Sequence, residues 1–177
     1  MLPSVRVKKG APGGVGPSAA ADSRGGFGTK IHLVSDGEGM PLAVRISAGQ
    51  AHESSRLEEV VDAVRIDRAD GRRRSLPAHV AGDKGYDVPR IRRWLRERGV
   101  RAVIPEKRRP HGRKRGRPPA FDRELYRKRN VIERCIGWLK HARRIATRFE
   151  KLALNFLGRL KLAMIQRYLR IYLRDTT

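Results

Sequence analysis

The sequence predicts an α/β fold, and three features of the 177-residue chain indicate it. Two runs of strand-forming residues, 30–34 and 42–47, flank the turn cluster Asp-Gly-Glu-Gly-Met-Pro, which predicts a β-hairpin. A strand, a helix and a second strand are expected over 78–104, at the spacing of a βαβ unit with parallel strands. From residue 121 a run without proline predicts one long helix.

The other elements follow along the chain. Residues 1–28 are rich in Gly, Ala, Pro and Ser and have no period, so they are expected to be disordered or a residual linker. Four apolar residues between 57 and 64 recur at helical spacing. Pro89 opens a further helix, which Gly99 ends. The apolar residues of a last helical run, 153–173, are expected to pack on the domain, with Lys and Arg outside.

The charge balance predicts a polyanionic partner. Lys and Arg number 41 against 18 Asp and Glu, a formal net charge of +23. Double-stranded DNA is the expected partner, because Lys and Arg displace its condensed counterions; acidic lipid or simple solubility are the alternatives. The segment 106–119 is expected to be a basic loop that contacts phosphates, with a solvated linker as its alternative. Its candidate DNA-binding residues are Arg113, Lys114, Arg115 and Arg117.

A reducing compartment is expected from the cysteine usage. Cys135 is the only cysteine, so no disulfide can form within the chain. No apolar stretch approaches the length of a membrane span, and the basic N-terminus has no apolar segment after it. The sequence therefore predicts a cytoplasmic protein with no membrane partner.

One face of the predicted long helix carries four residues able to do chemistry: Tyr126, Arg129, Glu133 and Lys140. At about 100° per residue they lie within roughly 60° of one another. The Glu could hold a divalent metal while the two cations clamp phosphates. An ion-paired, solvated helix face is the alternative that spacing alone leaves open.

A second candidate is Asp83, which follows a short apolar strand and precedes a helix. Open α/β sheets bind ligands at the carboxyl ends of parallel strands, and Mg²⁺ takes one or two carboxylates with water and phosphate oxygens. The alternative is a turn aspartate that caps the next helix. His52 and Glu53 are expected to cap a helix rather than to take part in catalysis.

These residues carry a family resemblance. The pattern Tyr126-x2-Arg129-x3-Glu133-x6-Lys140 resembles the signature around the last acidic residue of DDE-type insertion-sequence transposases. The blocks SRGGFGTKIHLVSDGEGMPLAVRISAGQAHESSRL and AGDKGYD resemble the hairpin and second-acid segments of the same enzymes. The resemblance runs from about residue 23 almost to the C-terminus, so 29–177 is expected to be a partial catalytic domain of this family.

The resemblance implies a ribonuclease-H-like fold, a mixed sheet with flanking helices, here expected to lack its first strand. It implies metal-dependent strand cleavage and transfer in DNA transposition, a DNA recombination reaction. The complete enzyme would use two Mg²⁺ or Mn²⁺ ions, and Asp83 and Glu133 would be catalytic metal ligands. Tyr126, Arg129 and Lys140 would contact DNA, in a homodimer or larger transposase complex.

The sequence departs from the family pattern at the first acid. MLPSVRV, upstream of the hairpin, has no acidic residue; Asp22 lies too close to the hairpin, and Asp36 is expected to be a turn residue. Whether this chain alone is an enzyme therefore stays open. It would be an incomplete fragment without an upstream reading frame that supplies the first Asp. It would be either the downstream reading frame of an element whose full enzyme is made by frameshifting, or a truncated, decaying copy. The alternative is an inactive DNA-binding accessory or inhibitor of a full transposase; a nuclease of the same fold ranks lower.

Overall fold

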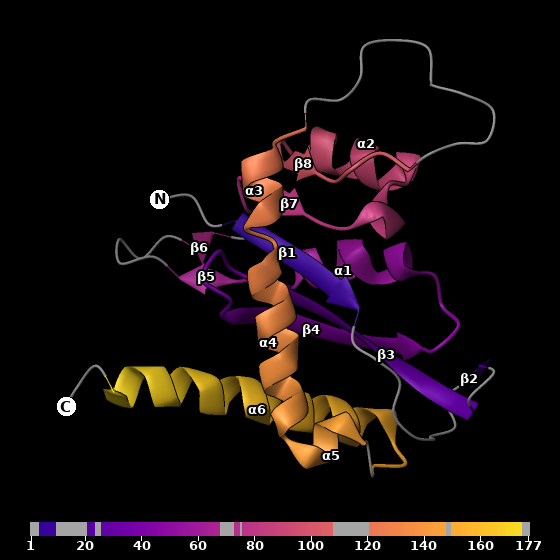
Figure 1. The fold of residues 1–177 in the computed structure, drawn as a ribbon, viewed down its shortest axis with the longest axis vertical. Helices are drawn as coiled ribbons and strands as arrows, with labels where there is room; N and C mark the ends of the chain where they lie inside the picture. The colour runs from indigo at the N-terminus through magenta and orange to yellow at the C-terminus, as the bar shows by residue number, and fades with distance from the viewer. Residues whose placement is uncertain are drawn as a thin grey trace.

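A mixed β-sheet forms the centre of the molecule. The computed structural model describes residues 4–9, 21–23, 26–67, 73–74, 76–107, 121–147 and 150–174. Within them, six strands share one sheet, whose path β4-β3-β1-β7-β8 has β2 paired to the first residues of β3 (Figure 1). Their bounds are β1 Ser4–Lys9, β2 Ala21–Ser23, β3 Gly26–Ser35, β4 Pro41–Ala48, β7 His79–Ala81 and β8 Arg101–Val103.

The expected lack of a first strand is wrong. β1 lies in the middle of the sheet, antiparallel to β3 and parallel to β7, with Arg6 opposite Ser35 on one side and Ala81 on the other. Valines alternate with polar residues along it, which suits a strand. Without β1, two central strands would each expose an unpaired row of backbone N–H and C=O groups. The range 1–28 therefore holds β1, β2 and the start of β3 among its described residues.

The predicted hairpin is confirmed as β3 and β4, which pair from Thr29–Ala48 to Ser35–Pro41. Asp36 closes its turn by accepting hydrogen bonds from the backbone N–H groups of Glu38 (2.9 Å) and Met40 (2.8 Å). The turn role expected for this residue is therefore confirmed.

The strand–helix–strand unit is also confirmed. α2, Pro89–Glu97, connects β7 to β8, and these two strands are parallel in the register Ala81–Val103. Between the hairpin and this unit lie a 3-10 helix, η1 (Glu53–Arg56), and α1 (Leu57–Asp62). A small antiparallel pair, β5 (Ile66–Asp67) and β6 (Arg73–Arg74), follows.

Alternation along β3 sends side chains to two cores. Val34 packs with apolar residues of α1 and α2 on one face of the sheet. Ile31 and Leu33 pack on the other face with residues of the C-terminal helices. The α/β class with helices on both faces of a mixed sheet, implied by the ribonuclease-H-like resemblance, is confirmed.

The C-terminal half is helical but not one long helix. Its segments are α3 (Arg123–Arg127), α4 (Asn130–His141), α5 (Arg143–Ala146) and α6 (Ala153–Arg174). Figure 1 shows α4 crossing in front of the sheet, with α3 toward α2 and β8 and with α6 across its far end. Within the described residues, no helix is both long and apolar enough to cross a membrane.

The expectation that the apolar residues of α6 pack on the domain is mostly wrong. Phe156, Leu160 and Ala163 are buried against α4 and α5. Most other large apolar side chains of α6 stay exposed, because this helix touches the domain along one narrow side only. The exposed ones include Leu154, Leu162, Ile165, Leu169 and Tyr172.

Candidate active site

Asp83 lies at the carboxyl end of β7, where the neighbouring strands β1 and β8 run parallel to it. Its carboxylate accepts a hydrogen bond from the Gly85 N–H at 2.8 Å and so caps the 3-10 helix η2, Lys84–Tyr86. The capping role, stated as the alternative, is therefore real. A carboxylate has about four acceptor positions, so one such bond leaves capacity for a ligand.

Gly82 fixes the path of the chain into this turn. A Cβ at residue 82 would approach the Tyr86 ring to 3.0 Å, closer than real Cβ atoms normally come. Tyr86 is fully buried in the core that lies under α1 and α2. The buried ring therefore holds the backbone of residues 82–86 in place, and with it the direction of Asp83.

Asp87 ends the same turn and forms a network that the sequence did not predict. Its Oδ1 lies 2.6 Å from Nε of Arg92 and its Oδ2 accepts from the Lys107 N–H at 2.7 Å. Arg92 also donates to the Ile104 carbonyl at 2.8 Å. The Asp87 side chain is only 7% exposed, so its charge is buried and paired. Both oxygens of the Asp87 carboxylate therefore have structural partners.

The predicted helix through the four-residue signature is broken between Tyr126 and Glu133. The N–H groups of Arg129, Val131 and Ile132 bond to carbonyls three residues back, which tightens the chain between α3 and α4. The two helices have different anchors: α3 has no buried residue, whereas α4 buries four. An ion pair from Arg101 of β8 to the capping Asp122, at 3.4 Å, holds the start of α3.

Tyr126, Arg129 and Glu133 nevertheless remain in contact. The Arg129 guanidinium carbon lies 5.4 Å from the centroid of the Tyr126 ring, and Nη1 lies 3.2 Å from Glu133 Oε1. The Phe121 ring lies 5.2 Å from that of Tyr126 and extends the cluster outward. The ion pair stated as the alternative is present, but its side chains are only 20% and 30% exposed. Lys140 is exposed in the last turn of α4, two turns beyond Glu133.

The position of Glu133 follows from packing on both sides of α4. Ile132, Ile136 and Leu139 are buried against β3 and β4. Gly39 of the hairpin turn, at φ +90°, comes so close to Val131 that a Cβ there would lie 3.3 Å from its carbonyl oxygen. The hairpin turn therefore abuts the start of α4 directly.

The elements that carry the two candidate acids both neighbour β1. α4 contacts β1 and β3, and β1 is the parallel neighbour of the strand that leads into Asp83. The sequence of β1, SVRVKK, contributes cations and no carboxylate. Among the described residues, no group of three or more His, Cys, Asp or Glu side chains is placed to hold a metal ion.

Of two other groups of candidate residues, the structure describes one. His52 is the N-cap of η1 and accepts from the Ser54 N–H at 3.3 Å, so its expected capping role is confirmed. The candidate DNA-binding residues of the basic loop lie outside the described residues: Arg113, Lys114, Arg115 and Arg117.

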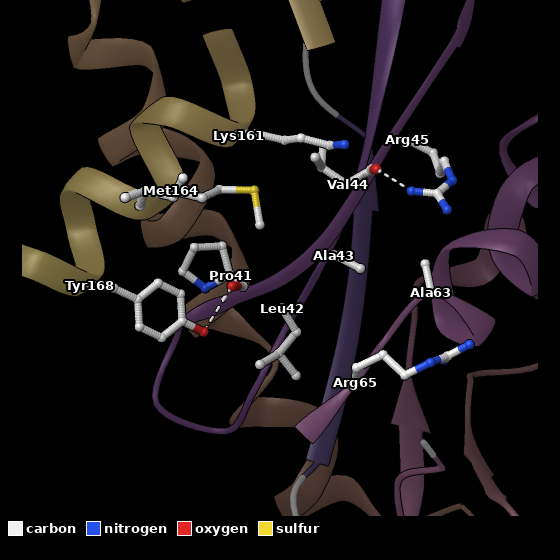
Figure 2. A pocket seen from close by; sticks show the side chains of 11 residues that line it. Pro41, Leu42, Ala43, Val44, Arg45, Ala63, Arg65, Lys161, Met164 and Tyr168 are labelled. Atoms are coloured by element: carbon white, nitrogen blue, oxygen red, sulfur yellow. Dashed lines mark hydrogen bonds between the residues drawn. The ribbon is translucent and has the colours of Figure 1, made fainter. Parts of the chain in front are cut away.

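A separate pocket of about 590 Å³ lies between β4 and α6. Figure 2 shows Tyr168 donating to the Pro41 carbonyl at 3.0 Å beside it, with Arg45, Arg65 and Lys161 around it. Neither candidate acid lines this pocket. Its basic and apolar lining therefore belongs to a different surface from the candidate active site.

Comparisons with known proteins test the family resemblance that the signature residues carry. The family model described as "Transposase DDE domain" matches residues 8–166. A protein named as a transposase for insertion sequence element IS402, from Burkholderia cepacia, is 36% identical over 127 residues, which are 71% of this chain and 56% of that protein. One named for IS6501, from Brucella ovis, is 29% identical over 142 residues, 80% of this chain and 98% of that protein.

The chain thus spans little more than half the length of its IS402 relative. The chain is also similar to a crystal structure of the catalytic core domain of BIV integrase, with a TM-score of 0.47 and 12% identity. The superposition covers 92% of this chain and 80% of that one. The family match includes both candidate acids and the whole Tyr126–Lys140 signature. The chain belongs to the DDE transposase family, and within it resembles the transposases of insertion sequences.

Proposed function

We propose that this chain is part of the catalytic domain of an insertion-sequence transposase, which binds DNA and supplies two of the acids for strand cleavage and transfer. The observation that carries the proposal is the placement of Asp83 and Glu133 on elements that flank β1, inside the segment matched by the family. DNA bound across this face would meet both acids together with Arg129.

Electrostatics supports DNA as the partner. A net charge of +23 favours a polyanion, and binding would release counterions from the phosphates. Arg129 is oriented by Tyr126 and Glu133, so it would bind a phosphate or a base edge with little loss of side-chain freedom. Lys140, exposed on the same helix, would act as a second phosphate contact. The basic loop residues Arg113, Lys114, Arg115 and Arg117 are proposed to add sequence-independent affinity.

The residues fit a divalent metal only in part. Mg²⁺ and Mn²⁺ prefer oxygen ligands, and Asp83 and Glu133 are the carboxylates that would contribute them. The described residues assemble no three-ligand group, however. When bound, such ions supply activation of a water or 3′-hydroxyl and stabilise the leaving oxygen. We derive no step through them for this chain.

The missing carboxylate leads to the proposed limit on activity. β1 lies beside β7, but it carries Arg6 and Lys8 and no acid. The three cations in the sequence of β1, Arg6, Lys8 and Lys9, would favour phosphate binding over metal binding on this strand. The third acid would have to come from outside β1, so we expect this polypeptide to bind DNA without efficient strand transfer by itself.

The test uses the purified chain, Mg²⁺ or Mn²⁺ and a duplex carrying the ends of its element. We expect binding that weakens steeply with salt, and no efficient cleavage. Glu133→Gln is the matched control, because it keeps the shape of the side chain and removes the charge. Efficient cleavage that Glu133→Gln abolishes would show that the missing acid is dispensable. Failure to bind DNA at low salt would refute the proposal as a whole.

The alternative is an accessory protein that inhibits a full transposase. The lack of an acidic residue on β1 favours it as well. Co-expression with an intact transposase of the same element separates the two possibilities. An accessory role predicts fewer transposition events in cells. An unchanged or raised frequency contradicts it, and leaves the incomplete catalytic fragment.

A further inference from the structure

β4 is an edge strand of the sheet. Among the described residues it pairs with β3 on one side and with no strand on the other. An edge strand presents backbone N–H and C=O groups that no neighbouring strand takes up. Two carbonyls of β4 accept from side chains instead. The Val44 carbonyl accepts from the Arg45 guanidinium and the Pro41 carbonyl from the Tyr168 hydroxyl, each at 3.0 Å. This edge therefore offers a place for another extended chain.

The pocket of about 590 Å³ between β4 and α6 lies along this edge. Its lining includes the consecutive residues 41–45, although the side chains of a strand alternate between two faces. Ala43 belongs to the core under α1 and α2, and Val44 to the core on the opposite face. A pocket that is lined from both faces of a strand lies at the edge between them. Its volume is in the range of ligand pockets, about 300–1,000 Å³.

The two walls of the pocket differ in chemistry. In Figure 2, Met164 and Tyr168 of α6 lie on one side of β4, and Arg45 and Arg65 lie on the other. The α6 residues of the lining are spaced by three, one and three positions, so they share one side of the helix. They are Lys161, Met164, Ile165 and Tyr168. From the first to the last the helix rises about 10 Å, the length of about three residues of extended chain. A mainly apolar wall therefore faces a basic one over the length of a short strand.

Among the described residues, the cations of this pocket have no carboxylate partner. Arg45, Arg65 and Lys161 line it, and none of its lining residues is acidic. Arg65 donates to the backbone carbonyls of Asp62 and Val64, and Arg45 donates to a carbonyl of its own strand. Hydrogen bonds to neutral carbonyls leave the positive charges uncompensated. The pocket therefore favours an anionic occupant.

The lining distinguishes between anionic partners. Duplex DNA carries negative charge, but it has no peptide groups to pair with a strand edge and gains little from an apolar wall. A second copy of β4 would set cation against cation, which disfavours pairing of the two edges. An extended peptide with alternating carboxylate and apolar side chains matches the strand edge, the basic wall and the apolar wall. Its alternate side chains would face opposite walls of the pocket.

We propose that the free edge of β4 binds an acidic, extended segment of a partner protein, which adds to the sheet as a further strand beside α6. Its carboxylates would pair with Arg45 and Arg65, and its apolar side chains would pack on Met164 and Ile165. Neither candidate acid lines this pocket, so the site is separate from the proposed active site.

The first test measures fluorescence anisotropy of a labelled eight-residue peptide of alternating Glu and Val with the full chain, at about 0.15 M salt. We expect saturable binding. The double variant Arg45→Gln, Arg65→Gln should weaken it by about 10-fold or more, because two charge-assisted contacts are lost. The matched control is Arg93→Gln, Arg96→Gln, which removes two exposed charges from α2, the helix that packs on β8, and should leave binding unchanged. No binding by the wild type, or equal weakening in both variants, overturns the proposal.

The second test uses the wild-type chain and so does not depend on how a variant folds. The same peptide with N-methyl groups on alternate backbone nitrogens keeps its charge but loses hydrogen-bond donors, and should bind about 10-fold more weakly or worse. The unmodified peptide should also slow amide hydrogen exchange within β4. Equal binding of the two peptides, or unchanged exchange in β4, would mean that charge alone attracts the peptide, and would overturn the proposal.

A duplex of random sequence distinguishes this site from a DNA contact. Arg45→Gln, Arg65→Gln should weaken duplex binding no more than Arg93→Gln, Arg96→Gln does, because both remove two charges from the chain. If it weakens duplex binding as strongly as it weakens peptide binding, and the α2 control does not, the pocket belongs to the DNA-binding surface and the proposal fails.

Discussion

The guanidinium of Arg129 lies 3.2 Å from the carboxylate of Glu133, one turn further along the chain, and its central carbon lies over the Tyr126 ring, 5.4 Å from the centroid. The partly buried pair links the aromatic cluster at α3 to the candidate acid on α4. Arg129 therefore has two functions in this structure, since it orients Glu133 and it supplies a cation beside it.

Removing that cation should cost stability. Arg129→Ala removes the ion pair of a carboxylate that is only 30% exposed, and we expect the free energy of unfolding in urea to fall by about 1 kcal/mol. Arg129→Lys should recover part of the loss, because it restores the charge but not the guanidinium over the Tyr126 ring. If Arg129→Ala is as stable as the wild type, the pair contributes nothing to the fold.

Asp87 should contribute more to the free energy of unfolding than Arg129 does, because its charge is more deeply buried. Asp87→Ala would leave Arg92 without its carboxylate and the Lys107 N–H without an acceptor, at a cost of about 3 kcal/mol. The matched control is Asp62→Ala, whose ion pair with Arg98 spans 4.0 Å at half-exposed side chains and should contribute less than about 1 kcal/mol. Equal losses in the two variants, measured by urea unfolding, would contradict the assigned network.

Two glycine-to-alanine changes should have opposite signs. Gly82→Ala places a methyl group 3.0 Å from the buried Tyr86 ring, and should destabilise by about 1–3 kcal/mol while shifting the Asp83 turn. Gly137→Ala adds a methyl group in open space on the exposed side of α4, and should stabilise by up to about 1 kcal/mol. Thermal melts of both variants test the pair, and destabilisation by Gly137→Ala would contradict the position of α4.

Cys135 should be unreactive in the folded protein. Burial raises its thiol pKa from 9.0 to about 11, so almost no thiolate exists at neutral pH. Because this pKa is raised on folding, the associated stability is present below pH 9 and is lost as pH rises toward 11. Cys135→Ala should remove this contribution to the fall of stability with rising pH in the alkaline range. Burial also raises the pKa of Tyr168, so part of that pH dependence should remain. Rapid modification by a thiol reagent without denaturant would contradict burial.

Lys140 should contribute to DNA affinity without contributing to stability, because its side chain is exposed. Lys140→Ala should reduce the slope of log affinity against log salt by about 1, as expected for one lost phosphate contact. Arg170→Ala removes the same charge from α6 and is the control for a simple change in net charge. Identical slopes for the two variants would mean that Lys140 makes no specific contact.

The sequence by itself determined the elements whose signals are local. Strand alternation and a turn aspartate define the β3–β4 hairpin, because Asp36 bonds to backbone groups two and four residues away. Pro89 and the glycine after α2 bound the helix of the βαβ unit for similar local reasons. The spacing of Tyr126, Arg129, Glu133 and Lys140 identified the family, which the comparison with the family model confirmed.

Only the tertiary structure decided the features that depend on distant partners. β1 has a weak local signal and becomes a strand because β3 and β7, far along the chain, leave a place between them. The break between α3 and α4 arises because β8 holds one helix while the core holds the other. Asp87 and Arg92 bury their charges only because Lys107 returns beside them. The apolar periodicity of α6 predicted packing on the domain, but the structure leaves most of these residues exposed, since spacing records which residues share a face and not what covers it.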